Sequence, residues 1–121
     1  MLEGSKITGH TTSNYSSPSD YGADGSYGVV YIYETNTTFA VFEMRGGIIT
    51  GNTSTGTSSG GVYTRGSVGS GRFRMYGGSI TGNSPRDVYI DATNPQSWAE
   101  KTSGTIGVAT PSELATQPTY P

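Results

Sequence analysis

The stretch Phe42–Asn52 reads FEMRGGIITGN, and 31 residues later Phe73–Asn83 repeats it as FRMYGGSITGN. Eight of the eleven positions are identical. A chain that repeats itself in this way buries apolar side chains against its own neighbouring repeats rather than in one globular core. The repeat therefore predicts an architecture of similar layers stacked on one another.

A shorter word, Val-Tyr, recurs at Val30, Val62 and Val88. From each of these valines to the isoleucine of the following Gly-x-Ile, the chain runs 19, 18 and 18 residues. From such an isoleucine to the next of these valines it runs 23, 13 and 8 residues, counted first from Ile7. One segment of nearly fixed length and one of variable length are typical of a coil of strands whose insertions leave on one side.

Alternation of apolar and polar residues predicts three short strands in each repeat, around Val-Tyr, Phe-x-Met and x-Ile-Thr, with bends at Gly-Gly and Gly-Asn. Right-handed crossovers are overwhelmingly preferred between parallel strands, so we expect an all-β fold, a right-handed parallel β-helix or β-solenoid of about three rungs. The expected inward columns are Val30/Val62/Val88, Phe42/Phe73, Met44/Met75 and Ile7/Ile49/Ile80/Ile106.

The composition agrees with a thin core. Gly, Ser and Thr occupy 53 of 121 positions, whereas Leu, Ile, Val and Phe supply only 19. Gly, Ser and Thr disfavour helix interiors, which excludes a helical bundle. The net charge of -2 and the seven scattered basic residues argue against nucleic acid as a partner. The absence of Cys excludes disulfides, and no stretch has the character of a membrane span or a signal peptide, so membrane insertion is not expected.

One β-helix domain is expected over residues 1–121: a first partial rung with a long loop (1–29), the repeats (30–107) and a C-terminal cap or tail (108–121). Thr110 and Pro111 have the pattern of a helix start, which predicts a short helical cap from Pro111 to about Thr116.

Two further features concern the ends of the coil. Continuing the register places Ala99 and Lys101 where Phe73 and Met75 stood, with Trp98 beside them to fold over the last rung. At the other end, either the segment 10–28 folds over the first rung or a partner stacks on it, which leaves end-to-end self-association open.

Equivalent outward positions predict specific contacts between neighbouring rungs. Glu43 and Arg74 should form an exposed ion pair, and Arg45 should lie over the ring of Tyr76. Asn52 and Asn83 occupy the same corner and should stack their amides as a ladder. The single histidine, His10, takes that corner in the first repeat and is expected to be a plain turn residue.

The words Phe-x-Met-x-Gly-Gly-x-Ile-x-Gly-Asn and Gly-Gly-Val-Tyr, the latter at Gly60–Tyr63, resemble the repeats of bacterial adhesin-like proteins with polymorphic outer-membrane-protein-type, right-handed parallel β-helix architecture. The resemblance covers residues 28–107. It implies a secreted or cell-surface bacterial protein, often one piece of a longer repetitive chain.

Tyrosine is the abundant residue without an evident place in the core. Tyr31, Tyr63 and Tyr89 should form an outward column, with Tyr33 nearby and with Tyr21 and Tyr27 in the preceding variable segment. Outward aromatic rings beside polar loops bind sugar rings or anchor a protein interface. The alternative is that the column only packs beneath its own loops. These six tyrosines are the candidate ligand-binding residues, for a glycan or for a host or cell-surface protein.

Acidic residues offer little catalytic chemistry. Asp87 and Asp91 lie on one face of one strand at a separation of ~13 Å, which exceeds the ~5–9.5 Å between paired glycosidase carboxylates. Asp20 and Asp24 have oxygen ligands suited to calcium, but their spacing fits an ordinary turn as well. We therefore expect no catalytic residue, no metal site and no cofactor.

The sequence favours a non-enzymatic structural or adhesive β-solenoid module. The alternative from another class is a polysaccharide-active β-helix enzyme, a lyase or hydrolase, or its inactive remnant. Such an enzyme needs acidic or basic side chains that converge from adjacent rungs on one face. Neighbouring outward positions here form no such acid–base pair.

Overall fold

The computed structural model describes residues 1–12, 28–34, 39–56, 59–66, 70–90 and 98–110. Every regular element in these residues is a β-strand, and all nine strand pairings are parallel. The prediction of an all-β fold with parallel strands is confirmed for this part of the chain.

The strands form four sheets, which we name after their columns. The isoleucine sheet contains, in order, β1 (Lys6–Thr8), β5 (Ile48–Thr50), β9 (Ser79–Thr81) and β12 (Thr105–Ile106). The tyrosine sheet contains β13 (Ala109–Thr110), β10 (Val88–Ile90), β7 (Val62–Gly66) and β3 (Val30–Glu34). The phenylalanine sheet contains β11 (Trp98–Lys101), β8 (Ser70–Met75) and β4 (Phe39–Met44). The corner sheet contains β2 (Thr11–Thr12) and β6 (Thr53–Ser54).

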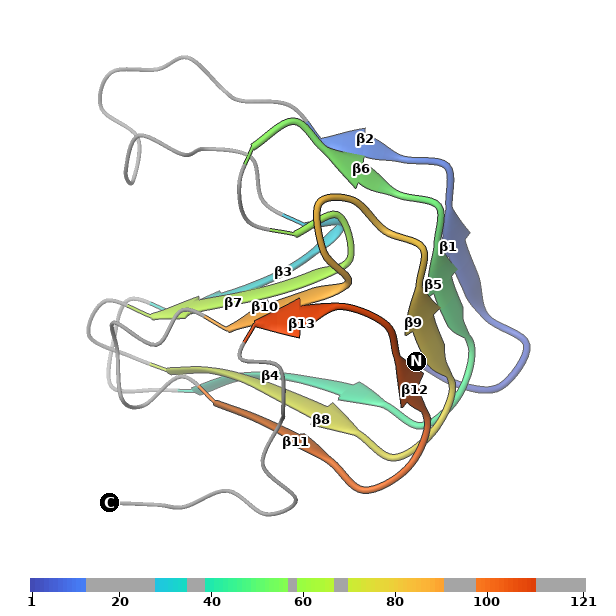
Figure 1. Cartoon of the computed structure of the whole chain (residues 1–121). Coiled ribbons are helices and arrows are strands. Elements are labelled where there is room, and N and C mark those ends of the chain that lie inside the picture. Colours follow the sequence, from blue (N-terminus) through green and yellow to red (C-terminus); the bar gives the residue numbers. More distant parts are fainter. Residues whose placement is uncertain (13–27, 35–38, 57–58, 67–69, 91–97, 111–121) are drawn as a thin grey trace.

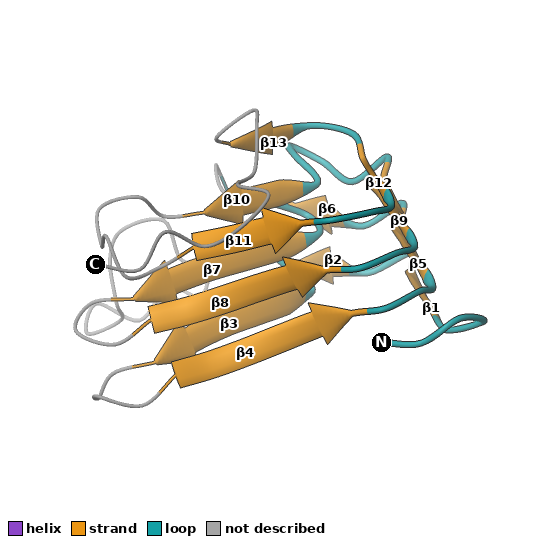
Figure 2. Ribbon diagram, turned by 90° about the horizontal axis from the view of Figure 1, so that it is seen from below, coloured by secondary structure: helices purple, strands orange, loops and turns teal. Residues whose placement is uncertain are grey.

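The chain visits the sheets in a constant order, from the isoleucine sheet past the corner to the tyrosine sheet and then to the phenylalanine sheet (Figure 1). Each return adds a strand beside the previous one, so that β4, β8 and β11 lie one above the other (Figure 2). We call the strands formed in one such pass a layer: β1–β4 are the first, β5–β8 the second and β9–β11 the third. The corner sheet was not predicted, because its strands are only two residues long.

The register of the strands agrees with the repeat in the sequence. Phe42 lies directly beside Phe73, with ring centroids 5.7 Å apart. The valine and isoleucine columns pair as predicted, including the link from Ile80 to Ile106. Ala99 and Lys101 pair with Phe73 and Met75, as the continued register predicts.

The core is the narrow space between the three main sheets. Its middle members are fully buried: Met44, Met75, Ile49, Ile80, Val62, Val88 and Phe73. Members of the same columns in the first layer and on β12, such as Ile7, Phe42 and Ile106, are only half-buried. Full burial of each such side chain contributes about 1.5–3 kcal/mol, so the core is most stabilising in the second and third layers.

The methionine column has one member more than the sequence indicated. The carbonyl oxygen of Met1 accepts the backbone N–H of Arg45 at 2.8 Å, as that of Met44 accepts the N–H of Tyr76 at 2.8 Å. Each methionine Cε lies 2.7–2.9 Å from the place of a Cβ on the glycine of the next layer; these glycines are Gly47, Gly78 and Gly104. All three glycines have φ between 88° and 95°, a backbone conformation that strains other residues. A side chain at these positions would also collide with the methionine, so both the backbone angle and the available space require glycine.

Several predictions fall outside the described residues. They are the helical cap from Pro111 to about Thr116, the side chain of Trp98, and residues 13–27 of the segment 10–28, which was one of two alternatives for covering the first rung.

Candidate functional site

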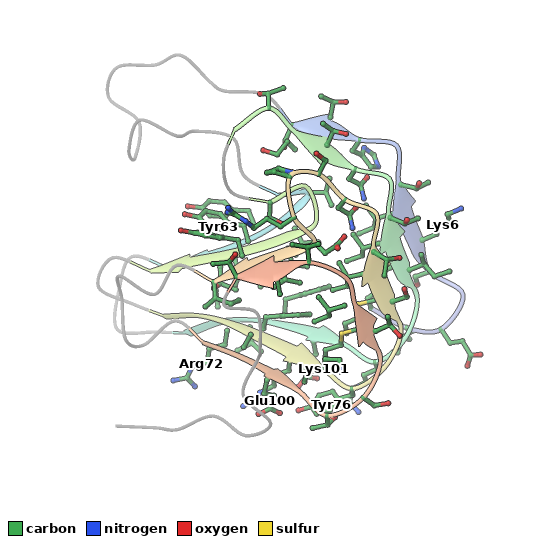
Figure 3. All side chains as sticks on the ribbon, in the orientation of Figure 1. Lys6, Tyr63, Arg72, Tyr76, Glu100 and Lys101 are labelled. Atoms are coloured by element: carbon green, nitrogen blue, oxygen red, sulfur yellow. The ribbon has the colours of Figure 1, made fainter. Side chains whose placement is uncertain are left out.

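The predicted tyrosine column exists. Tyr31, Tyr63 and Tyr89 occupy directly paired positions on β3, β7 and β10. The rings of Tyr31 and Tyr63 are stacked at 5.4 Å between centroids with an interplanar angle of 9°, and those of Tyr63 and Tyr89 lie 5.3 Å apart at 32°. Figure 3 shows Tyr63 pointing away from the phenylalanine sheet. Parallel, in-register pairing thus brings three residues distant in sequence into one aromatic column.

The column is less accessible than an outward position suggests. Tyr63 has only 7% of its surface exposed, and Tyr31 and Tyr89 are half-buried. Aromatic rings that stack on each other cover each other's faces, and a ring face is what a sugar needs for stacking. Tyr63 therefore presents no open ring face, and a ligand at this edge would meet the rims and hydroxyl groups of the rings.

Sequence reasoning missed one member of this site. The guanidinium carbon of Arg86 lies 5.0 Å from the centroid of the Tyr89 ring, a cation–π geometry. Arg86 belongs to the variable segment between β9 and β10 and has no counterpart in the repeated words, so the repeat gave no signal for it. Its contact adds a positive charge to the last ring of the column.

Of the other three candidate tyrosines, the structure describes at most the backbone. The backbone of Tyr33 pairs with that of Arg65 in the tyrosine sheet. The side chain of Tyr33 lies outside the described residues, as do Tyr21 and Tyr27. The calcium hypothesis for Asp20 and Asp24 falls outside them as well.

The asparagine ladder is confirmed and is more connected than predicted. Asn52 Nδ2 donates to Asn83 Oδ1 at 2.8 Å, and the backbone N–H of Asn52 donates to the same oxygen at 3.1 Å. The backbone N–H of His10 donates to Asn52 Oδ1 at 3.0 Å, which places His10 at the ladder corner, as predicted. The His10 side chain is exposed and supplies no amide to the ladder.

Asp87 ends the ladder. Its Oδ1 accepts the backbone N–H and the Nδ2 of Asn83, both at 2.8 Å, and its Oδ2 accepts the backbone N–H of Val108 at 2.7 Å. The side chain is 2% exposed. A buried carboxylate that accepts three N–H groups is held as an acceptor and is not presented to a substrate. Asp91 lies outside the described residues.

The charged contacts on the phenylalanine sheet also form. Glu43 carboxylate oxygens lie 3.6 Å from Arg74 Nη1 and 3.2 Å from Arg45 Nη2, and the Arg45 guanidinium lies 5.2 Å from the Tyr76 ring centroid. Glu100 follows Arg74 in the register, and Figure 3 shows Glu100 and Tyr76 along the same border of the molecule. Exposed pairs of this kind contribute about 0–1 kcal/mol, and they bring no two carboxylates together.

A hollow of about 280 Å³ opens at the first layer, and it was not predicted. Its lining consists of Ile7, His10, Thr11, Thr12, Gly28 and Val29. It therefore lies between the isoleucine sheet, the corner sheet and the start of β3. The repeat gave no signal for it, because it depends on what fills the corner of each layer.

Within the described part of the chain, no group of three or more His, Cys, Asp or Glu side chains is arranged to hold a metal ion. No helix in that part is long and apolar enough to cross a membrane. Comparison of the chain with protein-family models, with curated proteins and with solved structures gives no match.

Proposed function

We propose that the protein is a right-handed parallel β-helix of about three rungs that serves as a non-catalytic structural and adhesive module of a secreted or cell-surface bacterial protein. The observation that carries the proposal is the in-register stacking of the repeated words through three sheets. A constant order of sheets with parallel pairing is the path of a β-helix, and parallel crossovers are right-handed in nearly all proteins.

The adhesive part of the proposal concerns the edge formed by Tyr31, Tyr63, Tyr89 and Arg86. Insertions of a repeat protein gather on one face, which is commonly the binding face. Here the variable segments begin after the isoleucine sheet and end at the first residues of the tyrosine sheet. The row of phenol groups with a cation at one end suits a glycan or a protein surface that offers hydrogen-bonding groups at its rim.

The enzymatic alternative has weaker support. Two carboxylates are buried among the described residues: Asp87 has three N–H donors already in place, and Glu100 lies beside Arg74 in the register. The paired outward positions combine acid with base at Glu43 and Arg74 or stack rings. General acid–base hydrolysis of a glycan needs two carboxyl groups about 5–9.5 Å apart, whereas the phenylalanine sheet places Arg74 between Glu43 and Glu100.

Insertion of an extra repeat tests the architecture. A second copy of residues 46–76 placed after Tyr76 should fold as one additional rung, because Gly46 and Gly77 are equivalent. In a repeat protein each added unit contributes its own interface, so the midpoint of thermal unfolding should rise. Insertion of the same residues in scrambled order is the control. Equal loss of cooperative unfolding in both proteins would contradict the β-helix.

A glycan array combined with a polysaccharide-degradation assay tests the function. We expect retention of glycans or cell-surface protein without release of sugar products, and loss of retention in Tyr31→Ala. Thr105→Ala, an exposed residue of another sheet, is the matched control. Degradation that disappears in Asp87→Asn would instead establish the enzymatic alternative.

A further inference from the structure

One side of the first strand of the phenylalanine sheet is open along most of its length. β4 is the last strand in the order of this sheet, so its far side has no strand beside it among the described residues. Only the end of that side is occupied: the ammonium group of Met1 donates to the Glu43 carbonyl oxygen at 2.7 Å, and the Met1 carbonyl oxygen accepts the Arg45 N–H at 2.8 Å. This is the hydrogen-bond pattern of adjacent strands, so the open side has the geometry to receive a further strand.

A strand that lies clear of Met1 can use the backbone groups of Phe39 and Val41. Residues of a strand point their N–H and C=O groups alternately to its two sides. Glu43 and Arg45 use theirs toward Met1, so the other odd-numbered residues of β4 face the open side as well. The N–H and C=O groups of Phe39 and Val41 have no partner there within the described part of the chain. Pairing with another strand would satisfy all of them.

β4 also lacks the features that keep an exposed strand edge from pairing. Proteins protect such edges with very short strands, proline, lysine or inward-pointing charges. β4 is six residues long, and its first four residues, Phe39–Phe42, include no charge and no proline. The side chain of Val41 is 48% exposed, and the half-buried ring of Phe42 has Phe73 stacked on one face. An unprotected edge of this kind favours association with a strand of another molecule.

The C-terminal end of the stack is protected by comparison. β12 and β13 are only two residues long, and β11 carries Glu100 followed by Lys101 at an inward position. The open side of β4 therefore finds no matching edge at the C-terminal end of a second copy. The edge that matches it is β4 of the second copy, and contacts between like surfaces give closed two-fold dimers, which are the commonest oligomers.

We infer that the first layer is a self-association surface, on which two copies of the chain pair their β4 strands antiparallel about a two-fold axis. With Phe39 opposite the partner's Val41, the free groups of both copies form four backbone hydrogen bonds. Ala40, the smallest side chain of the strand, then meets the partner's Ala40 at the axis, and Glu43 and Met1 lie outside the paired region. The result is one continuous sheet in the order β11-β8-β4-β4-β8-β11. The inference uses strand edges alone and does not rest on the proposed function.

Sedimentation equilibrium of the full chain, from micromolar to low millimolar concentration, tests the dimer. We expect a monomer–dimer equilibrium that does not proceed to larger species. Val41→Lys places a lysine on each of the paired edges and should raise the dissociation constant at least about tenfold. Ile48→Lys is the matched control and should associate like the parent, since Ile48 is 44% exposed but lies on β5, which has a strand on both sides. Circular dichroism of both variants should keep the strand signal of the parent, because both side chains are exposed.

Cysteine cross-linking tests the register. The chain has no cysteine, so a single introduced thiol can form a disulfide only with its own copy in the partner. Directly opposed residues of a non-hydrogen-bonded antiparallel pair have Cα atoms about 4.5 Å apart, which is within the range of a disulfide. Ala40→Cys should therefore form a covalent dimer when oxidised with copper phenanthroline. Val41→Cys should react far more slowly, because its two copies lie diagonally, about 7–8 Å apart.

Four outcomes would overturn the inference. A parent chain that stays monomeric at all concentrations would mean that the chain covers its own first rung. A dimer that Val41→Lys leaves intact and Ile48→Lys dissociates would place the interface on the isoleucine sheet. Masses that keep growing with concentration would indicate head-to-tail stacking, which a two-fold dimer excludes. Faster cross-linking of Val41→Cys than of Ala40→Cys would refute the register.

Discussion

The two ends of the stack are finished in different ways. At the C-terminal end the columns change character: Ala99 follows Phe73, Lys101 follows Met75, and Asp87 closes the asparagine ladder. At the N-terminal end the columns keep their apolar members, and Met1 continues the methionine column below Met44. In the described residues β12 and β13 continue two of the sheets beyond the third layer, but Lys101 at an inward position and the Asp87 carboxylate at the end of the ladder match no further copy of the repeated word. The comparison shows that the last layer is chemically closed and the first is open.

The largest loss of stability should come from a substitution in the middle of the stack, away from both ends. Ile80→Asp buries a charge with no partner among fully buried neighbours and should remove cooperative thermal unfolding, a loss of more than about 4 kcal/mol. Thr81→Asp, one residue on and outward, should shift the midpoint only slightly. Similar melting of the two variants would refute the inward and outward assignment.

Phenylalanine truncation compares the middle with the open end. Phe73→Ala should lower the free energy of unfolding by about 3–5 kcal/mol, because the ring is fully buried and its space cannot collapse. Phe42→Ala should lower it by about 1–3 kcal/mol, since that ring is already half-exposed. Urea unfolding of both variants measures the difference, and equal losses would mean that the first layer is as enclosed as the second.

A substitution of Asp87, where the asparagine ladder ends, tests how the C-terminal end of the stack is closed. Asp87→Asn turns one acceptor into a donor that faces the N–H groups of Asn83 or Val108 and should lower stability by about 2–3 kcal/mol. Hydrogen exchange should speed up first at the amides of Asn83 and Val108. Unchanged exchange at both amides would show that the carboxylate is not what closes the ladder.

The smallest effect is expected at the open end of the same ladder. His10→Asn should add an amide that donates to Asn52 Oδ1, as Asn52 does to Asn83, and should raise stability by about 1 kcal/mol. His10→Ala, which removes an exposed side chain, should leave the thermal midpoint nearly unchanged. A fall in stability with asparagine would mean that the first corner has a different geometry.

Sequence reasoning predicted the stacking well because identical words imply identical environments. The spacing of Val30, Val62 and Val88 was enough to align the strands, and the continued register was enough to place Ala99 and Lys101. Reasoning from pairs of equivalent positions also predicted the contact of Glu43 with Arg74.

Sequence reasoning failed for residues whose contacts have no equivalent in another repeat. Met1 enters the core although the word around it is hardly recognisable, and Arg86 reaches Tyr89 from a segment of variable length. Alternation left the accessibility of Tyr63 open, because it gives the side of a strand on which a residue lies, whereas burial depends on what else covers that side.

By itself the sequence determined the repeat, the strand register and the identity of each column, because these follow from local periodicity and from the requirement that a chain poor in apolar residues keep them out of water. Only the tertiary structure decided how the asparagine ladder ends, which aromatic faces stay accessible and where a corner is left unfilled. Those properties depend on the contacts of single residues with distant neighbours, and no repeated pattern encodes them.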